Sequence, residues 1–298
     1  MIVPIRRAAW ECKQSREVRG ACVCAKMSTD TLVVQFASSG MIASGLLSIF
    51  SATSLFPSRV TIGEVTRRNP VPWSPRDFGG GGSSGRSPIF GLMWTIIFTS
   101  QFAFALAVLV NALQQHEVRD PAVLFNQCAC VAGALLMASL WAPLFKEERN
   151  WTFVLASILL VATAAMTSVG AVASKPFFMD EWYTMFGGIS TTFFAGWTLV
   201  AAGLSVGIVT RINNRGMNAP EPKDTKGTSS YFPLVLSILA AVLAIVFANP
   251  IFPVPLLLTL PFVPGIVKDW WVWLPAIICA IGIGTGIAMV YVYQEYPF

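Results

Sequence analysis

The sequence predicts an all-α integral membrane protein, a helical bundle of about seven transmembrane helices. Of its 298 residues, 55% are hydrophobic and only 12% are charged, whereas soluble domains usually carry about 25% charged residues. The apolar residues form uncharged runs of 18 to 26 residues. Runs of this length cross a bilayer core of about 30 Å as helices.

Seven such runs follow one another along the chain. Pro57 ends the first run, and Pro88 stands at the first turn of the second, where a missing N–H costs nothing. A short charged turn, 146–150, separates the third run from the fourth. The runs are 31–56, 89–113, 122–145, 151–173, 185–210, 231–248 and 274–293.

Four regions follow from this pattern. Residues 1–30 form a polar N-terminal tail, 31–210 a membrane core of five helices, and 211–230 a polar linker. Residues 231–298 form a C-terminal membrane region with two helices. Between these two helices, residues 249–264 hold five prolines. A regular helix cannot contain them, so we expect a broken or interfacial segment there.

Several classes of function lack the residues that they need. The one histidine, His116, lies in a predicted loop, so we predict no metal site and no catalytic residue. The basic residues lie in loops, without the basic and aromatic pattern of a nucleic-acid surface. No Asp, Glu, Lys, Arg or His lies within a predicted span, which argues against a proton-coupled transporter. An enzyme is therefore less expected than a binding protein.

The charges of the connections predict an orientation. The connections after the first, third and fifth spans carry five, two and four Lys or Arg residues, and the other connections carry one each. The positive-inside rule places the three more basic connections in the cytosol or its organellar equivalent. Seven crossings would place the C-terminus on the same side as these connections. The basic N-terminal tail, however, favours the opposite orientation. Mitochondrial, plastid and endomembrane locations stay open.

Aromatic side chains point to a ligand site. Phe90, Trp94 and Phe98 are spaced i, i+4 and i+8 and form one stripe down the second predicted span. Trp141 and Trp197 lie within two other spans. Tryptophans in membrane helices often serve only as packing residues or interface anchors. Three of them together with the stripe favour a pocket for a flat apolar ligand.

Four motifs in this order resemble the translocator protein/tryptophan-rich sensory protein family (TspO/MBR). The resemblance covers roughly residues 31–210. Phe98 stands where the family usually has tyrosine, and a glycine-rich insertion displaces the second proline of the first loop. The motifs are Pro72-Trp73-Ser74-Pro75, Phe90-Gly-Leu-Met-Trp94-Thr95-Ile-Ile-Phe98, Leu140-Trp141-Ala142-Pro143-Leu144-Phe145 and Gly196-Trp197-Thr-Leu-Val-Ala201.

The resemblance implies a five-helix TspO-like core with two further C-terminal helices, which binds or senses a tetrapyrrole, a sterol or a related apolar molecule. The first loop would act as a lid over the pocket. No cofactor is required, and a tetrapyrrole is a candidate ligand. The implied ligand-binding residues are Trp73, Phe90, Trp94, Phe98, Trp141, Pro143 and Trp197.

Two other functions stay open. The proline-rich break at 249–264 is compatible with a facilitative transporter of a neutral or apolar solute, because discontinuous helices often line transport sites. Small-residue faces, Gly203/Gly207 and Gly282/Gly286, are compatible with an assembly protein or a homodimer. The expected partners are thus the lipid bilayer, a hydrophobic small molecule and a second copy of the chain, with no nucleic acid.

Overall fold

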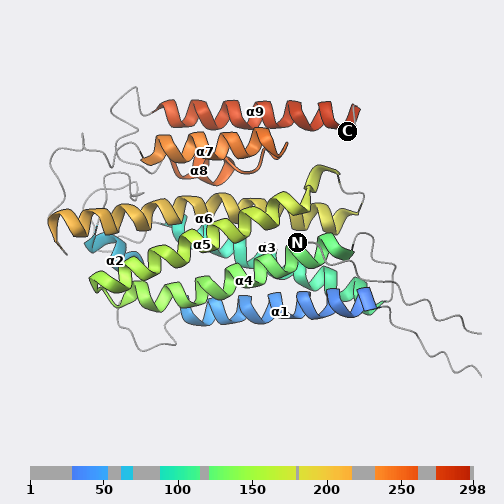
Figure 1. Ribbon diagram of the computed structural model, residues 1–298, viewed down its shortest axis with the longest axis horizontal. Coiled ribbons are helices and arrows are strands. Elements are labelled where there is room, and N and C mark those ends of the chain that lie inside the picture. Colours follow the sequence, from blue (N-terminus) through green and yellow to red (C-terminus); the bar gives the residue numbers. More distant parts are fainter. Residues whose placement is uncertain are drawn as a thin grey trace, which may run out of the picture.

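The computed structural model describes residues 29–52, 62–69, 88–114, 121–178, 181–216, 232–260 and 273–295. Within these residues the chain is a bundle of helices without strands (Figure 1), which confirms the all-α membrane fold. The helices are α1 (Thr29–Ala52), α2 (Ile62–Arg68), α3 (Pro88–Leu113), α4 (Pro121–Lys146), α5 (Asn150–Ser174), η1 (Pro176–Phe178), α6 (Trp182–Arg215), α7 (Phe232–Val246), α8 (Val254–Thr259) and α9 (Trp273–Glu295).

The observed helices follow the first five predicted runs closely, with two differences. The α2 helix lies in a segment that we predicted to be loop, and it packs on α4. Its Val65 is buried, and Arg68 pairs with Glu148 of the α4–α5 turn at 2.9 Å. The α6 helix continues to Arg215, five residues into the predicted linker. Residues 217–230 of that linker and residues 1–28 of the N-terminal tail lie outside the described residues.

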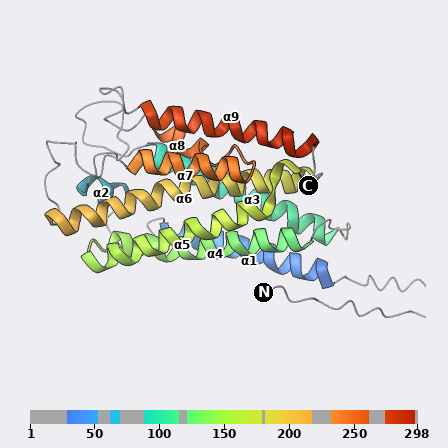
Figure 2. The ribbon, with the colours of Figure 1, turned by 45° about the horizontal axis from the view of Figure 1, so that its top comes forward.

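The α6 helix is the axis of the bundle. In its most apolar window, 78% of the residues are buried, the highest share of any of the long helices that the structure describes. It packs against α3 and α5 on one side and against α7 and α8 on the other (Figures 1 and 2). The α1 helix lies at the edge of the bundle against α3 and α4.

Hydrogen bonds at one level of α6 connect it to three neighbours. Consecutive helical residues point about 100° apart, so three adjacent side chains face three different elements. Here each accepts a hydrogen bond from a buried amide: Ser190 from Gln101 of α3 at 3.3 Å, Thr191 from Gln127 of α4 at 3.0 Å, and Thr192 from Asn249 after α7 at 2.7 Å.

The sixth predicted span does not cross the bundle. The α7 helix has 15 residues, about 22 Å at 1.5 Å per residue, which is less than the bilayer core. After α7 the chain turns at residues 247–253 and returns as the short α8. The described part of the predicted break, residues 249–260, thus belongs to a hairpin with α7, and six described helices are long and apolar enough to span a membrane.

Glycines allow the hairpin to pack tightly against α6 and α9. A Cβ atom on Gly196 of α6 would lie 2.5 Å from the carbonyl oxygen of Phe252. One on Gly282 of α9 would lie 2.8 Å from Ala241, and one on Gly286 would lie 3.2 Å from Ala244. These close approaches require residues without a side chain. The small-residue faces of α9 are therefore occupied within the chain itself.

The α9 helix ends, at Glu295, at the end of the bundle where α1 begins. Gln294 of α9 donates to the carbonyl of Phe177 at 3.2 Å, beside the α5–α6 connection. Near the start of α1, Gln35 donates to the carbonyl of Ala112 at 3.2 Å, beside the end of α3. Our placement of the C-terminus at the other, more basic end was wrong, because it counted α7 as a crossing (Figure 1).

Candidate functional site

Three helices carry the predicted aromatic residues. Trp94 and Phe98 lie one turn apart on α3, Trp141 and Pro143 lie near the end of α4, and Trp197 lies in the middle of α6. Trp73 lies outside the described residues. Phe90 belongs to the first turn of α3, and its side chain is outside the described part of the chain.

Trp94 is the centre of the resulting aromatic cluster. Its ring stacks on Phe98 with centroids 5.5 Å apart and on Trp141 with centroids 6.1 Å apart. The Trp197 ring meets it edge-on at 6.3 Å, and the Phe194 ring does so at 6.2 Å. These distances lie in the range of favourable aromatic pairs. The structure thus brings together four of the seven predicted ligand-binding residues.

The cluster extends beyond the predicted residues. Phe145 lies one turn after Trp141 with ring centroids 5.4 Å apart, and Phe153 of α5 meets Phe145 at 5.3 Å. Phe194 lies three residues before Trp197 on α6 and is fully buried. The spacing i, i+3 and i, i+4 marks Phe145 and Phe194 as neighbours of the predicted tryptophans. That spacing could have identified both residues from the sequence.

Pro143 differs from the other predicted residues. It lies inside α4, is half-buried, and does not end the helix, which continues to Lys146. A proline within a helix removes one backbone hydrogen bond and kinks the helix. Its position two residues after Trp141 makes it a determinant of α4 geometry beside the cluster.

The rings of the cluster differ in how deeply they are buried. Trp197 is fully buried and Trp141 is 6% exposed, whereas Trp94 and Phe98 are half-buried. The rings pack directly on one another, so a planar ligand has to displace one of them. Trp94 is the least buried of the three tryptophans.

Trp141 carries an unused hydrogen-bond donor. Its indole Nε1 is buried and finds no acceptor among the described residues. A buried N–H without a partner costs about 1–3 kcal/mol. An acceptor on a bound molecule would recover this energy.

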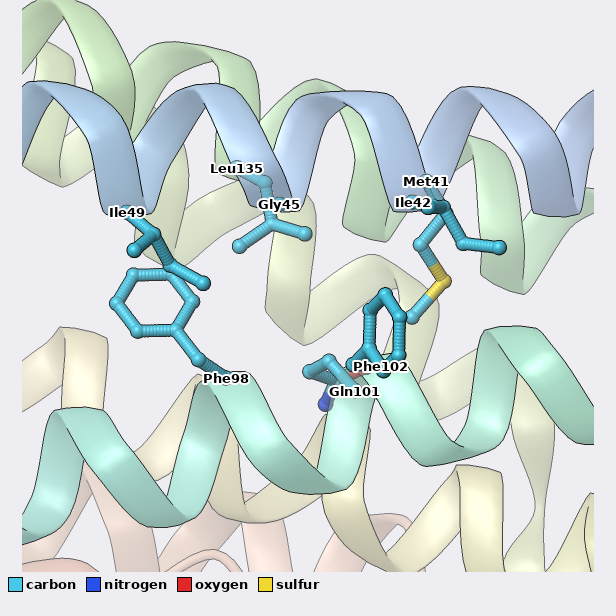
Figure 3. A pocket seen from close by; sticks show the side chains of 8 residues that line it. All are labelled: Met41, Ile42, Gly45, Ile49, Phe98, Gln101, Phe102 and Leu135. Atoms are coloured by element: carbon cyan, nitrogen blue, oxygen red, sulfur yellow. The ribbon is translucent and has the colours of Figure 1, made fainter.

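A small hollow lies on the other side of Phe98, between α1, α3 and α4 (Figure 3). Its volume is about 10 Å³. The residues around it are apolar except for Gln101, which lines it from α3 together with Phe98 and Phe102. The hollow is therefore an apolar space with one amide in its wall.

Among the described residues, no group of three or more His, Cys, Asp or Glu side chains could hold a metal ion. Comparisons with protein-family models, curated proteins and solved structures found no match. The site is therefore interpreted from its own geometry.

Proposed function

We propose that this integral membrane protein binds or senses a flat, largely apolar ligand, such as a tetrapyrrole, a sterol or a related molecule, in the manner of the translocator protein/tryptophan-rich sensory protein family. The observation that supports the proposal is the convergence of Trp94, Trp141 and Trp197 from three helices on one cluster. These are the tryptophans that the family motifs single out.

The chemistry of the cluster suits a planar ligand with a polar edge. Aromatic faces stack on a conjugated ring system with an offset, and their burial excludes water. The free N–H of Trp141 can donate to a carbonyl or carboxylate of the ligand. The ligand would replace the stacking contact between the rings of Trp94 and Trp141. These two side chains are joined by stacking alone, without a covalent bond or a hydrogen bond.

Packing around the hairpin favours a binding protein over a facilitative transporter. Non-helical backbone at membrane depth either lines a cavity or is buried in protein. Here Phe252 and Ala248 are buried, and the hairpin approaches Gly196 closely. The glycines of α9 that motivated an assembly function contact α7, so they do not form a free surface.

Quenching of tryptophan fluorescence by protoporphyrin IX tests the proposal. The purified protein is titrated beside a Trp94→Ala/Trp141→Ala variant. The matched control is Trp151→Ala/Trp182→Ala, which removes two tryptophans that are 59% and 65% exposed and lie outside the cluster. We expect saturable quenching in the wild type and the control and its loss in the cluster variant.

Circular dichroism and size-exclusion chromatography establish that each variant is folded. Saturable binding of equal affinity in a folded cluster variant would contradict the proposed site. Non-saturating quenching in all three proteins would mean that porphyrin only partitions into detergent, which also contradicts it.

A further inference from the structure

The wall of the hollow holds a hydrogen-bond acceptor that the protein leaves unused. Gln101 is 1% exposed, and its Oε1 accepts no hydrogen bond from the described residues. The residues that line the hollow contain no other amide and no charge. An amide oxygen in such an apolar environment is costly unless a donor reaches it.

Ser190 determines which atom of the Gln101 amide has no hydrogen-bond partner. The Ser190 hydroxyl donates to the carbonyl of Gly187 in its own helix at 3.0 Å, so its proton is already used. It can then only accept from Gln101, whose Nε2 lies 3.3 Å away. The amide nitrogen therefore faces α6, and the oxygen is the unpaired atom.

The position of the hollow restricts what can supply the donor. Gln101 is the fourteenth of the 26 residues of α3, so it lies about halfway across the bilayer. Phe102 is 44% exposed and Ile49 is 39% exposed, so the rim of the hollow faces lipid between α3 and α1 (Figure 3). A donor that arrives from the bilayer at this depth is carried by the hydrocarbon part of a lipid and not by its headgroup, which stays at the bilayer surface.

The size of the hollow restricts the group that enters it. About 10 Å³ is room for roughly one water-sized group, which matches a hydroxyl. We propose that the hollow binds a neutral lipid with a hydroxyl in the middle of its acyl chain. The hydroxyl donates to Gln101 Oε1, and the chain lies along the exposed apolar side chains at the rim of the hollow, such as Phe102 of α3 and Ile49 of α1.

Native mass spectrometry with two matched probes tests this site. The probes are methyl 12-hydroxystearate and methyl stearate, which differ only in the mid-chain hydroxyl. We expect the hydroxylated probe to bind with a dissociation constant about three- to tenfold lower, the effect of one hydrogen bond to a buried acceptor. Methyl 2-hydroxystearate, with its hydroxyl near the ester, should bind like methyl stearate.

Two pairs of variants connect the preference to the hollow. Gln101→Leu should abolish it, whereas Gln127→Leu should retain it, because Gln127 is also buried with a free Oε1 but does not line the hollow. Gly45→Ala should reduce it by filling the space, since its Cβ would lie 3.7 Å from Leu135 without a clash. Gly40→Ala, on the same helix with nothing within 4 Å, is its control.

Equal binding of both probes to the wild type would overturn the proposal, because a water molecule alone would then satisfy Gln101. A preference that persists in folded Gln101→Leu would also overturn it. Phe98 contacts both sites, but the variants of this test leave every residue of the aromatic cluster unchanged, so this site and the proposed porphyrin site can fail separately.

Discussion

At the scale of single residues, Asn249 holds the hairpin in place. It is 2% exposed, its Nδ2 donates to Thr192 of α6 at 2.7 Å, and its Oδ1 accepts from the backbone N–H of Ile251 at 3.3 Å. One side chain therefore satisfies the turn and connects it to the central helix. A buried turn needs such a partner, because water cannot reach its backbone groups.

We expect Asn249→Leu to destabilise the protein by about 1–3 kcal/mol, because the buried hydrogen bond to Thr192 is lost and the partly buried N–H of Ile251 loses its acceptor. Thermal unfolding in detergent measures the change. The control is Asn126→Leu on α4, which replaces an exposed asparagine and should have little effect. A double variant with Thr192→Val should destabilise by less than the sum of the two single changes. Full additivity would show that the two side chains do not depend on each other.

The sequence predicts the aromatic cluster better than it predicts the hydrogen bonds that Ser190, Thr191 and Thr192 of α6 accept. The spacing of Trp94 and Phe98 places both on one face of α3, and their stacking confirms that face. The partner of Gln101 could not be predicted, because it depends on which helix lies beside α3. Pairing between distant helices is a property of the packed bundle.

At the scale of elements, the α7–α8 hairpin shows what hydropathy can and cannot predict. The apolar run 231–248 looks the same whether it crosses the bilayer or turns back inside the protein, since both environments exclude water. Residues 249–264 were predicted to be broken because of their prolines, and the described part, residues 249–260, holds turns followed by the short helix α8. The direction of the chain after the break depends on the glycines of α6 and α9 that receive it.

We expect Gly196→Ala to destabilise the protein by about 1–3 kcal/mol, the cost of overpacking a tight contact. Its Cβ would lie 2.5 Å from the backbone oxygen of Phe252 and 3.0 Å from Pro255, so the hairpin has to move away from α6. Gly284→Ala on α9 is the control, because nothing lies within 4 Å of its Cβ. The melting temperature in detergent should fall for the first variant and not for the second. Equal melting temperatures would show that the hairpin is held loosely.

At the scale of the whole molecule, α6 unites the bundle through polar contacts as well as packing. Two hydroxyl pairs add to the three amide bonds by joining α6 to α5. Thr167 meets Thr198 at 3.0 Å, and Ser157 meets Ser205 at 2.7 Å. Hydrogen bonds between membrane helices contribute about 0.6 kcal/mol each on average. They fix the register of α6 against its neighbours, and this register brings Trp197 to the level of Trp94.

The number of crossings predicts on which side of the membrane each end of the bundle lies. Six crossings place Glu295 at the end of α9 on the same side as Gln114 at the end of α3, and Arg149 of the α4–α5 turn on the opposite side. Seven crossings would place Glu295 with Arg149. The positive-inside rule assigns the side of Arg149 to the cytosol or its organellar equivalent, because the most basic connections lie there.

Cysteine labelling in sealed vesicles checks this arrangement. Gln114→Cys, Arg149→Cys and Glu295→Cys are introduced singly into a chain whose six native cysteines are replaced by serine. These three positions are exposed. With a membrane-impermeant maleimide, Gln114→Cys and Glu295→Cys should react from the same side, and Arg149→Cys only after the vesicles are permeabilised, or the reverse if the vesicles are inverted. Shared labelling of Glu295→Cys and Arg149→Cys would mean that α7 crosses the membrane after all, and the hairpin would then have to be abandoned.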